Sequence, residues 1–306
     1  MTAVPPAAPT ATDATSVRGI LLMLTAGLSF VLMDATAKHL SQTYPVVQVV
    51  WARYLFHMLT LPLFFGGLRW GSVVRTPRLG LQLLRSLLLL GSTFFFFLAV
   101  KHIPLATATA IGFVGPLLVT ALSVPLLGET VGPRRWAAVV IGFTGVLVII
   151  RPGLGGMPGG MHWAMALPLL VAVCFALYQI STRILSRTDG WMTTLFYSAS
   201  VGLVVMTALV PFHWRTPDLE GWAWMALIGL IGGFGHLMMI KAFAAAPAST
   251  LAPFTYLQLV WSTAIGLLIF GDFPDGWTLV GAAIIAASGL YILYRERRLR
   301  GPSAVA

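Results

Sequence analysis

Long apolar runs alternate with short polar connections from one end of the chain to the other. A helix needs about 20 mostly apolar residues to cross the hydrocarbon core of a bilayer. Proline, glycine, arginine and acidic residues cluster between the runs, where they favour turns and helix ends. The pattern therefore predicts an all-α polytopic membrane protein. Its ten transmembrane helices are expected at residues 17–40, 46–66, 79–101, 105–127, 134–151, 162–185, 191–211, 220–243, 249–270 and 277–295.

A long internal repeat relates these helices to one another. Residues 104–129 are repeated without a gap as residues 247–272, 143 positions further along the chain. Each copy begins with proline, continues as an apolar run, and ends with glycine followed by an acidic residue, Glu129 or Asp272. The sequence therefore predicts two copies of one membrane hairpin, one in each half of the chain.

The Gly/Pro-rich connection 152–161 separates the two copies and is the natural linker between two domains. It divides the chain into a first five-helix repeat, residues 17–151, and a second, residues 162–295. Residues 1–16 are rich in proline, alanine and threonine, so we expect a disordered tail and not a cleavable signal. Residues 296–306 are expected to form a basic cytoplasmic tail.

An odd number of helices per repeat means that the second repeat crosses the membrane in the opposite direction to the first. Inverted repeats of this kind are the plan of many secondary transporters. The first helix of each repeat supports the relation, because residues 28–41 match residues 173–186 and align Asp34 with Gln179. The fold class predicted is thus two inverted five-helix repeats.

The composition agrees with a membrane protein. With 58% hydrophobic and 9% charged residues, the chain has too little polar surface to cover a soluble globule of 306 residues. The net charge of +10 does not indicate nucleic-acid binding, because the basic residues lie in short loops and at helix ends. If the N-terminus is cytoplasmic, thirteen basic residues lie on the inner side and four on the outer side, so both termini are predicted to face the cytoplasm.

Charged residues inside the apolar runs are the first candidates for a site. A charge at the centre of a membrane helix costs about 2.5–3.5 kcal/mol on insertion scales, so it needs a partner or an aqueous cavity. Asp34 and Arg53 are the clearest cases, both about 10 Å below the outer surface by helix rise. One interpretation is an internal ion pair that fixes helix packing, with Lys38 as a third member. The other is a site where Arg53 binds a substrate carboxylate, or Asp34 a cation or a proton.

Two histidines extend this set. His57 lies one turn below Arg53 on the same helix face, and an imidazole there can titrate near neutral pH, which suits proton coupling. His236 is the counterpart in the second half, on a helix face with Gly229 and Gly232 that should pack closely against another helix. The alternative for each histidine is a neutral ring that is hydrogen-bonded inside the core.

Polar and aromatic residues of later helices complete the candidate set. Gln258 needs a hydrogen-bond partner in lipid, so its helix face is expected to point inward. Tyr256 and Trp261 flank this face and suit a planar ligand, and Gln179 is a further polar candidate. Pro116 is expected to bend its helix.

No enzyme motif is found in the sequence. A GxxxxGK[ST] phosphate loop is absent, so ATP does not drive the protein by that route. HExxH and paired-cysteine patterns are also absent, which argues against zinc, and we expect no cofactor, metal site or catalytic residue. The single cysteine, Cys174, cannot form a disulfide within one chain.

Taken together, the ten-helix pattern, the duplicated hairpin and the segment GPRRWAAVVIGFTGVLVIIRPG (132–153) resemble the EamA-type branch of the drug/metabolite transporter superfamily. The resemblance covers residues 17–295. It implies bacterial inner-membrane carriers of small organic metabolites, with a substrate cavity between the inverted halves and the fifth and tenth helices on the periphery. Residues 94–111 are most similar to S-adenosylmethionine and riboflavin carriers of this branch.

The expected function is therefore secondary transport of an amino acid-, S-adenosylmethionine- or vitamin-like metabolite across the bacterial inner membrane by alternating access. Export by the same fold is the alternative, and an intramembrane enzyme or a structural membrane protein is the alternative of another class. The expected partners are a small-molecule substrate and the lipid bilayer, without nucleic acid. One monomer suffices for a pathway, and a dimer is compatible. We expect Asp34, Arg53 and His57 in the outer half of the path, and Gln179, His236 and Gln258 in the inner half.

Overall fold

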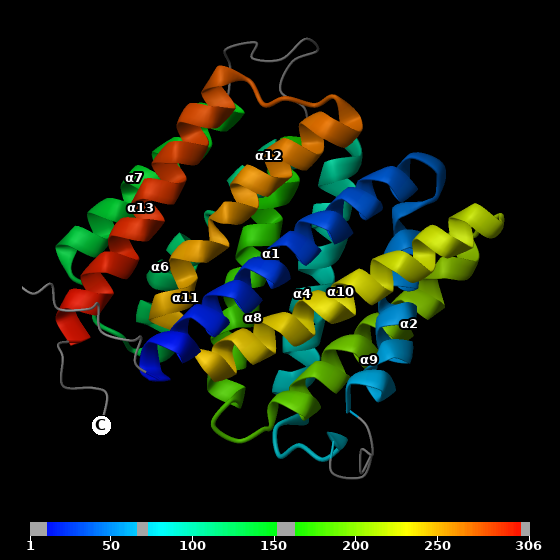
Figure 1. Cartoon of the computed structure of the whole chain (residues 1–306), viewed down its shortest axis with the longest axis horizontal. Helices are drawn as coiled ribbons and strands as arrows, with labels where there is room; N and C mark the ends of the chain where they lie inside the picture. Colours follow the sequence, from blue (N-terminus) through cyan, green and yellow to red (C-terminus); the bar gives the residue numbers. More distant parts are fainter. Residues whose placement is uncertain (1–10, 66–72, 152–162, 301–306) are drawn as a thin grey trace, which may run out of the picture.

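The structure, a computed structural model, describes residues 11–65, 73–151 and 163–300. In this part of the chain all regular elements are helical, and they form the ten predicted crossings (Figure 1). Among the described residues, nine of these crossings are long and apolar enough to span a membrane by length and hydropathy. In chain order, the crossings are α1 (Ala11–Thr43), α2 (Val46–Phe65), α4 (Leu79–His102), α5 (Leu105–Gly112) with α6 (Gly115–Leu127), α7 (Pro133–Ile150), η1 (Trp163–Ala166) with α8 (Leu167–Leu185), α9 (Trp191–Leu209) with η2 (Val210–His213), α10 (Leu219–Ala245), α11 (Ala248–Thr255) with α12 (Leu257–Phe270), and α13 (Gly276–Arg300).

Helix ends agree with the predicted ones within a few residues, except at the two ends of the chain. α1 begins at Ala11, so residues 11–16 of the expected tail are helical. α13 continues to Arg300, within the expected basic tail. The expected linker 152–161 lies outside the described residues.

The two halves pack in the same way with their roles exchanged. α1 packs against α10, and its counterpart α8 packs against α4, which is the counterpart of α10. In the same manner α1 contacts α11 and α12, whereas α8 contacts α5 and α6. α1 and α8 run in opposite directions in Figure 1. The inverted repeat predicted from the sequence is therefore present in the fold. α1 begins and α13 ends on one side of the bundle, called here the termini side, and the opposite side is called the far side (Figure 1).

Both copies of the repeated hairpin are broken at the same position. α5 and α6 are separated at Phe113, and α11 and α12 at the aligned Tyr256. The two rings at these breaks contact each other, with centroids 5.0 Å apart. Pro116 lies in the first turn of α6 and cannot donate a backbone N–H, which confirms the predicted bend. The second break is not predictable in this way, because Leu259 stands at the position aligned with Pro116.

The two copies also end alike. Gly128 after α6 and Gly271 after α12 have φ angles of 67° and 68°, in the left-handed region that favours glycine. The backbone N–H groups of Glu129 and Asp272 then donate to carbonyl groups six residues earlier, which satisfies a carbonyl near each helix end. The repeated motif therefore places an acidic side chain at the end of each hairpin helix, on opposite sides of the bundle.

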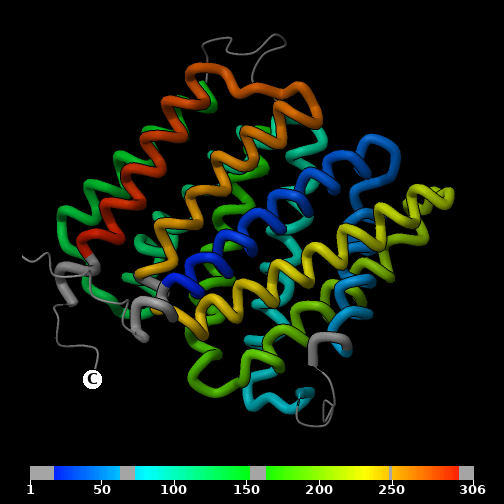
Figure 2. Tube along the Cα trace, viewed as in Figure 1, coloured from blue at the N-terminus to red at the C-terminus, as the bar shows by residue number. Residues whose placement is uncertain are grey.

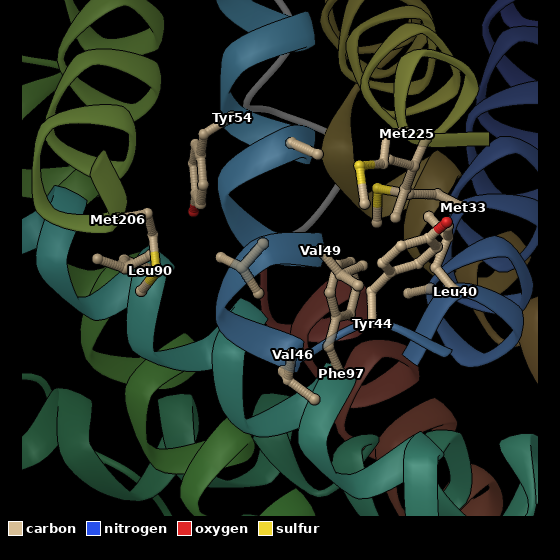
Figure 3. Close-up of a cluster of buried hydrophobic side chains, with 14 residues drawn as sticks. Met33, Leu40, Tyr44, Val46, Val49, Tyr54, Leu90, Phe97, Met206 and Met225 are labelled. Carbon is tan, nitrogen blue, oxygen red and sulfur yellow. The ribbon is translucent and has the colours of Figure 1, made fainter. Parts of the chain in front are cut away.

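A large apolar core surrounds α2. Figure 3 shows Tyr54 on the side of α2 toward Leu90 and Met206, and Met33 and Met225 on its other side. These side chains come from α1, α2, α4, α9 and α10, so the core joins helices of both halves. It holds α2 between the two repeats.

α7 and α13 form a pair at the edge of the bundle (Figure 2), in agreement with the peripheral fifth and tenth helices that the resemblance implies. Their backbones touch, because a Cβ on Gly281 would lie 2.5 Å from the carbonyl oxygen of Gly145. At the far side, Arg151 forms an ion pair with Asp275. Burial raises the pKa of Asp275, but hydrogen bonds from Thr278 and Arg151 outweigh this effect and lower it.

The two left-handed glycines provide a test of the repeated helix end. Gly128→Ala and Gly271→Ala should each lower the free energy of unfolding by about 1–2 kcal/mol, since a Cβ resists the left-handed conformation. Thermal unfolding in detergent measures the change. Gly80→Ala in α4 is the control, because a Cβ there has no neighbour within 4 Å. The Gly80 variant should be as stable as the wild type or slightly more so; equal stability of all three variants would contradict the assignment.

Candidate functional site

α1, α2 and α10 meet in a close junction near the middle of the bundle. Glycines on α10 permit the approach: a Cβ on Gly229 would lie 2.3 Å from the Cβ of Phe56, and one on Gly232 would lie 2.9 Å from the sulfur of Met33. The close packing predicted for this glycine face is confirmed. The junction gathers four predicted site residues, Asp34 from α1, Arg53 and His57 from α2, and His236 from α10.

Arg53 is buried in this junction, with 3% of its surface exposed. Its Nε lies 3.4 Å from the sulfur of Met33, and its Cζ lies 4.7 Å from the centroid of the Tyr54 ring. The Nη1 atom is buried and has no hydrogen-bond partner among the described residues. Because an unmade hydrogen bond of a buried charged group is costly, this donor is available to a ligand.

The two histidines are in contact. The ring of His57, which is 3% exposed, stacks on the ring of His236 with centroids 5.5 Å apart and an interplanar angle of 21°. Phe30 of α1 packs its edge against His236, with centroids 5.0 Å apart. His57 Nε2 is buried and without a partner in the described part of the chain. The two histidines thus lie at one level, and not in separate halves of the path as the sequence suggested.

Asp34 lies one turn beyond Phe30 on α1, is partly exposed, and is within Coulombic range of Arg53. No ion pair within 4 Å joins Asp34 to Arg53 in the residues that the structure describes, so the direct pair considered in the sequence analysis is not formed. Lys38, the proposed third member, instead forms an ion pair with Asp272 of the other half. Five neighbouring side chains at the junction are called here the junction ring. They are Asp34, Phe30, His236, His57 and Arg53.

A second buried arginine, Arg85 of α4, has a different environment. It is 3% exposed, and each nitrogen of its guanidinium group donates a hydrogen bond. Nε donates to the Thr182 hydroxyl at 2.6 Å and Nη2 to the Tyr178 hydroxyl at 2.8 Å, both on α8. Nη1 donates to the carbonyl of Thr194 and, at 2.7 Å, to the hydroxyl of Ser198 on α9. Arg85 therefore ties α4, α8 and α9 together, and four of its five N–H groups donate to protein atoms.

Two ion pairs at opposite ends of the bundle connect the halves. On the far side Lys38 of α1 pairs with Asp272, and on the termini side Arg183 of α8 pairs with Glu129. These pairs correspond to each other in the repeat, because Lys38 aligns with Arg183 and Asp272 with Glu129. They differ in burial, with 10% of the Lys38 side chain exposed and 55% of the Arg183 side chain. The basic side chain of the far-side pair is therefore more shielded from solvent than that of the termini-side pair.

The remaining predicted residues are more scattered. Gln258 and Trp261 of α12 pack against α1 at Gly27, one turn from Phe30, where a Cβ would lie 3.0 Å from the Trp261 ring. They therefore lie next to the junction ring. Tyr256 lies at the helix break with its hydroxyl against Gly289 of α13, away from the ring.

Gln179 is exposed on α8, between Phe175 and Arg183 on one helix face. Both neighbours on this face are turned toward α6, because Phe175 approaches Gly115 and Arg183 pairs with Glu129. Gln179 is therefore on the termini-side approach and not in the junction ring.

The two halves of the chain match a known family of membrane proteins. The model of the EamA-like transporter family matches residues 17–151 and 162–294, which are the two halves described above. The chain belongs to the EamA-like transporter family.

Relatives of this EamA-like transporter have different names. The chain is 30% identical over 268 residues to the S-adenosylmethionine uptake transporter of Rickettsia bellii, covering 87% of this chain and 89% of that protein. It is 28% identical to the riboflavin transporter of Vibrio cholerae, covering 92% and 94%, and 27% identical to the pseudopaline exporter CntI of Pseudomonas aeruginosa, covering 88% and 94%. A solved crystal structure shares the fold with a TM-score of 0.60 at 21% identity, covering 92% of this chain and 98% of that one.

One residue of this EamA-like transporter was missed in the sequence analysis although its signal was present. Arg85 lies six residues inside its apolar run, about as deep by helix rise as Arg53. Gln82 and Ser86 lie near it on one face of α4 and are also buried. The criterion that selected Arg53 thus also selects Arg85, but only the structure distinguishes a satisfied guanidinium from an unsatisfied one.

The difference in burial between the two ion pairs has a measurable consequence. Lys38→Met should lower the free energy of unfolding by about 2 kcal/mol, because it leaves Asp272 without the largely buried ammonium group that it pairs with. Arg183→Met, the matched variant of the other half, should change it by less than about 1 kcal/mol, since exposed pairs contribute little. Unfolding in mixed detergent micelles compares the two. Equal effects would show that the two ends of the bundle are sealed alike.

Proposed function

We propose that this EamA-like transporter is a secondary carrier that moves a small organic metabolite across the bacterial inner membrane by alternating access of its two inverted halves. The observation that carries the proposal is the junction ring, where Arg53 Nη1 and His57 Nε2 are buried without partners in the described part of the chain. Unsatisfied donors at this depth are costly unless a ligand uses them. The ring also joins the halves, because His236 comes from the second repeat and the other members from the first.

The positive-inside count supports an orientation in which the termini side faces the cytoplasm. In this orientation the pair Lys38–Asp272 closes the periplasmic end and the pair Arg183–Glu129 closes the cytoplasmic end. Movement of one half against the other would break one pair while the other stays formed. The breaks at Phe113 and Tyr256, which lie between the halves, provide a common point for this movement.

The relatives support a metabolite as substrate and leave both directions open, because two are named uptake or vitamin transporters and one an exporter. Uptake is the direction we propose, with Gln258 and Trp261 beside the ring as further substrate contacts. A single chain contains both halves, so a monomer suffices for the pathway.

Counterflow in proteoliposomes tests the carrier function. Vesicles loaded with unlabelled S-adenosylmethionine, riboflavin or a mixed metabolite library should accumulate the corresponding labelled compound transiently and saturably. A thermal-stability screen with the same library identifies further ligands, because a bound ligand raises the melting temperature. Saturable counterflow by at least one compound is the expected result. Conductance without saturation, or product formation in detergent, would replace the carrier by a channel or an enzyme.

Cross-linking tests the alternation of the two ends. In a Cys174→Ser background, cysteine pairs replace Lys38 with Asp272 or Arg183 with Glu129, and a short cleavable thiol cross-linker joins each pair. Each cross-link should stop counterflow, and cleavage should restore it, because transport requires both ends to open in turn. Single-cysteine variants treated with the same reagent are the controls. Undiminished counterflow with either end cross-linked would rule out alternating access through these gates.

A further inference from the structure

We propose that the junction ring binds the zwitterionic head group of an α-amino acid, so that the substrate carries a free ammonium and a free carboxylate on one carbon. The inference rests on the proposed carrier function and names the chemical class of its substrate. Each charge of the head group has a separate partner in the ring. Three observations support this assignment: two unused donors, one unused acceptor, and the contrast with Arg85.

The carboxylate has two buried donors available to it. Arg53 Nη1 and His57 Nε2 have no hydrogen-bond partner among the described residues, and both side chains are 3% exposed. The two residues are four positions apart on α2, so their Cβ atoms lie about 6 Å apart on one face. Two long side chains at this spacing can converge on one carboxylate, with a charge-assisted bond from Arg53 and a second bond from the tautomer of His57 protonated at Nε2.

The ammonium has one acceptor available to it. Asp34 is the acidic residue of the ring, and it forms no hydrogen bond or ion pair in the part of the chain described here. Its carboxylate interacts electrostatically with Arg53, but no Asp34 oxygen lies within 4 Å of a guanidinium nitrogen of Arg53. Among the described residues the two opposite charges are therefore not paired with each other, which leaves both available to a ligand. A head group of this kind places its ammonium near Asp34 and its carboxylate near Arg53.

Arg85 shows that the protein can supply a hydrogen-bond acceptor to each nitrogen of a buried arginine in this fold. Its three guanidinium nitrogens donate to α8 and α9 side chains and to one backbone carbonyl. It lies at a comparable depth and is as buried as Arg53. The free donor on Arg53 is therefore a property of the junction ring and not of every arginine in the membrane. Because it is equally buried but hydrogen-bonded, Arg85 is the matched control for Arg53.

The class can be tested with pairs of probes that differ in one group. S-adenosylmethionine is compared with its decarboxylated form, and methionine with its deaminated form, as competitors in counterflow and as stabilising ligands in detergent. Loss of either group should weaken binding about 10- to 100-fold, the value of a hydrogen bond to a charged group. If riboflavin, which has no amino acid head group, is carried while both amino acids fail to bind, the inference is overturned and the carrier function stands. If no compound is carried, both fail.

Variants separate ligand binding from a structural role. Asp34→Asn should abolish the preference for methionine over its deaminated form, and Arg53→Gln the preference for S-adenosylmethionine over its decarboxylated form. Arg53→Met should raise the melting temperature by about 2–4 °C, since it removes an unsatisfied buried charge. Arg85→Lys should lower the melting temperature and keep both preferences. If Arg53→Met instead lowers the melting temperature and both preferences survive in Arg53→Gln, Arg53 is structural and the assignment is wrong.

Discussion

The fold depends on one constraint: in hydrocarbon, each polar group must find its partner inside the protein. Backbone groups are satisfied within helices, but buried side chains need partners from neighbouring helices. Arg85 meets the constraint with hydrogen-bonding partners from two helices, α8 and α9, and Lys38 meets it with Asp272 across the boundary between the halves. Among the described residues, Arg53 Nη1 and His57 Nε2 do not meet it with protein atoms. The junction ring is thus a place where the constraint is left open for two adjacent side chains of one helix face.

Duplication explains how a short chain meets this constraint at two surfaces. The repeated hairpin ends in the same glycine conformation at Gly128 and Gly271, and each following acidic residue pairs with a basic residue of the opposite half. Because the halves are inverted, one motif produces an ion pair at each side of the bundle. The breaks at Phe113 and Tyr256 meet between the halves, so the same duplication also supplies two weak points in register.

The sequence predicts depth better than it predicts direction around a helix. Apolar runs locate the crossings, and the gapless repeat predicts the inverted halves. Depth alone brought Asp34 and Arg53 together and assigned Lys38 to Asp34, but Lys38 faces α12, and its partner is a residue 234 positions away. The contact between His57 and His236 was missed for the same reason. Which face of α1 meets which half depends on packing between repeats, and no local pattern encodes that packing.

The two halves share a scaffold but not its chemistry, and the difference suggests how a symmetric carrier acquires a substrate. Asp34 aligns with Gln179, so the ionisable side chain is kept in the first half and replaced by a neutral amide in the second. The three-helix junction of α4, α8 and α9 corresponds to that of α10, α1 and α2, in this order. Each junction encloses one arginine. In one, hydroxyl groups of Tyr178, Thr182 and Ser198 satisfy the guanidinium; in the other, Met33 sulfur and aromatic rings surround it. One three-helix arrangement thus surrounds an arginine with hydroxyl acceptors, and the related one leaves Arg53 Nη1 without a partner among the described residues. Binding capacity can therefore arise in one half of a duplicated fold while the other half retains the stability that the membrane requires.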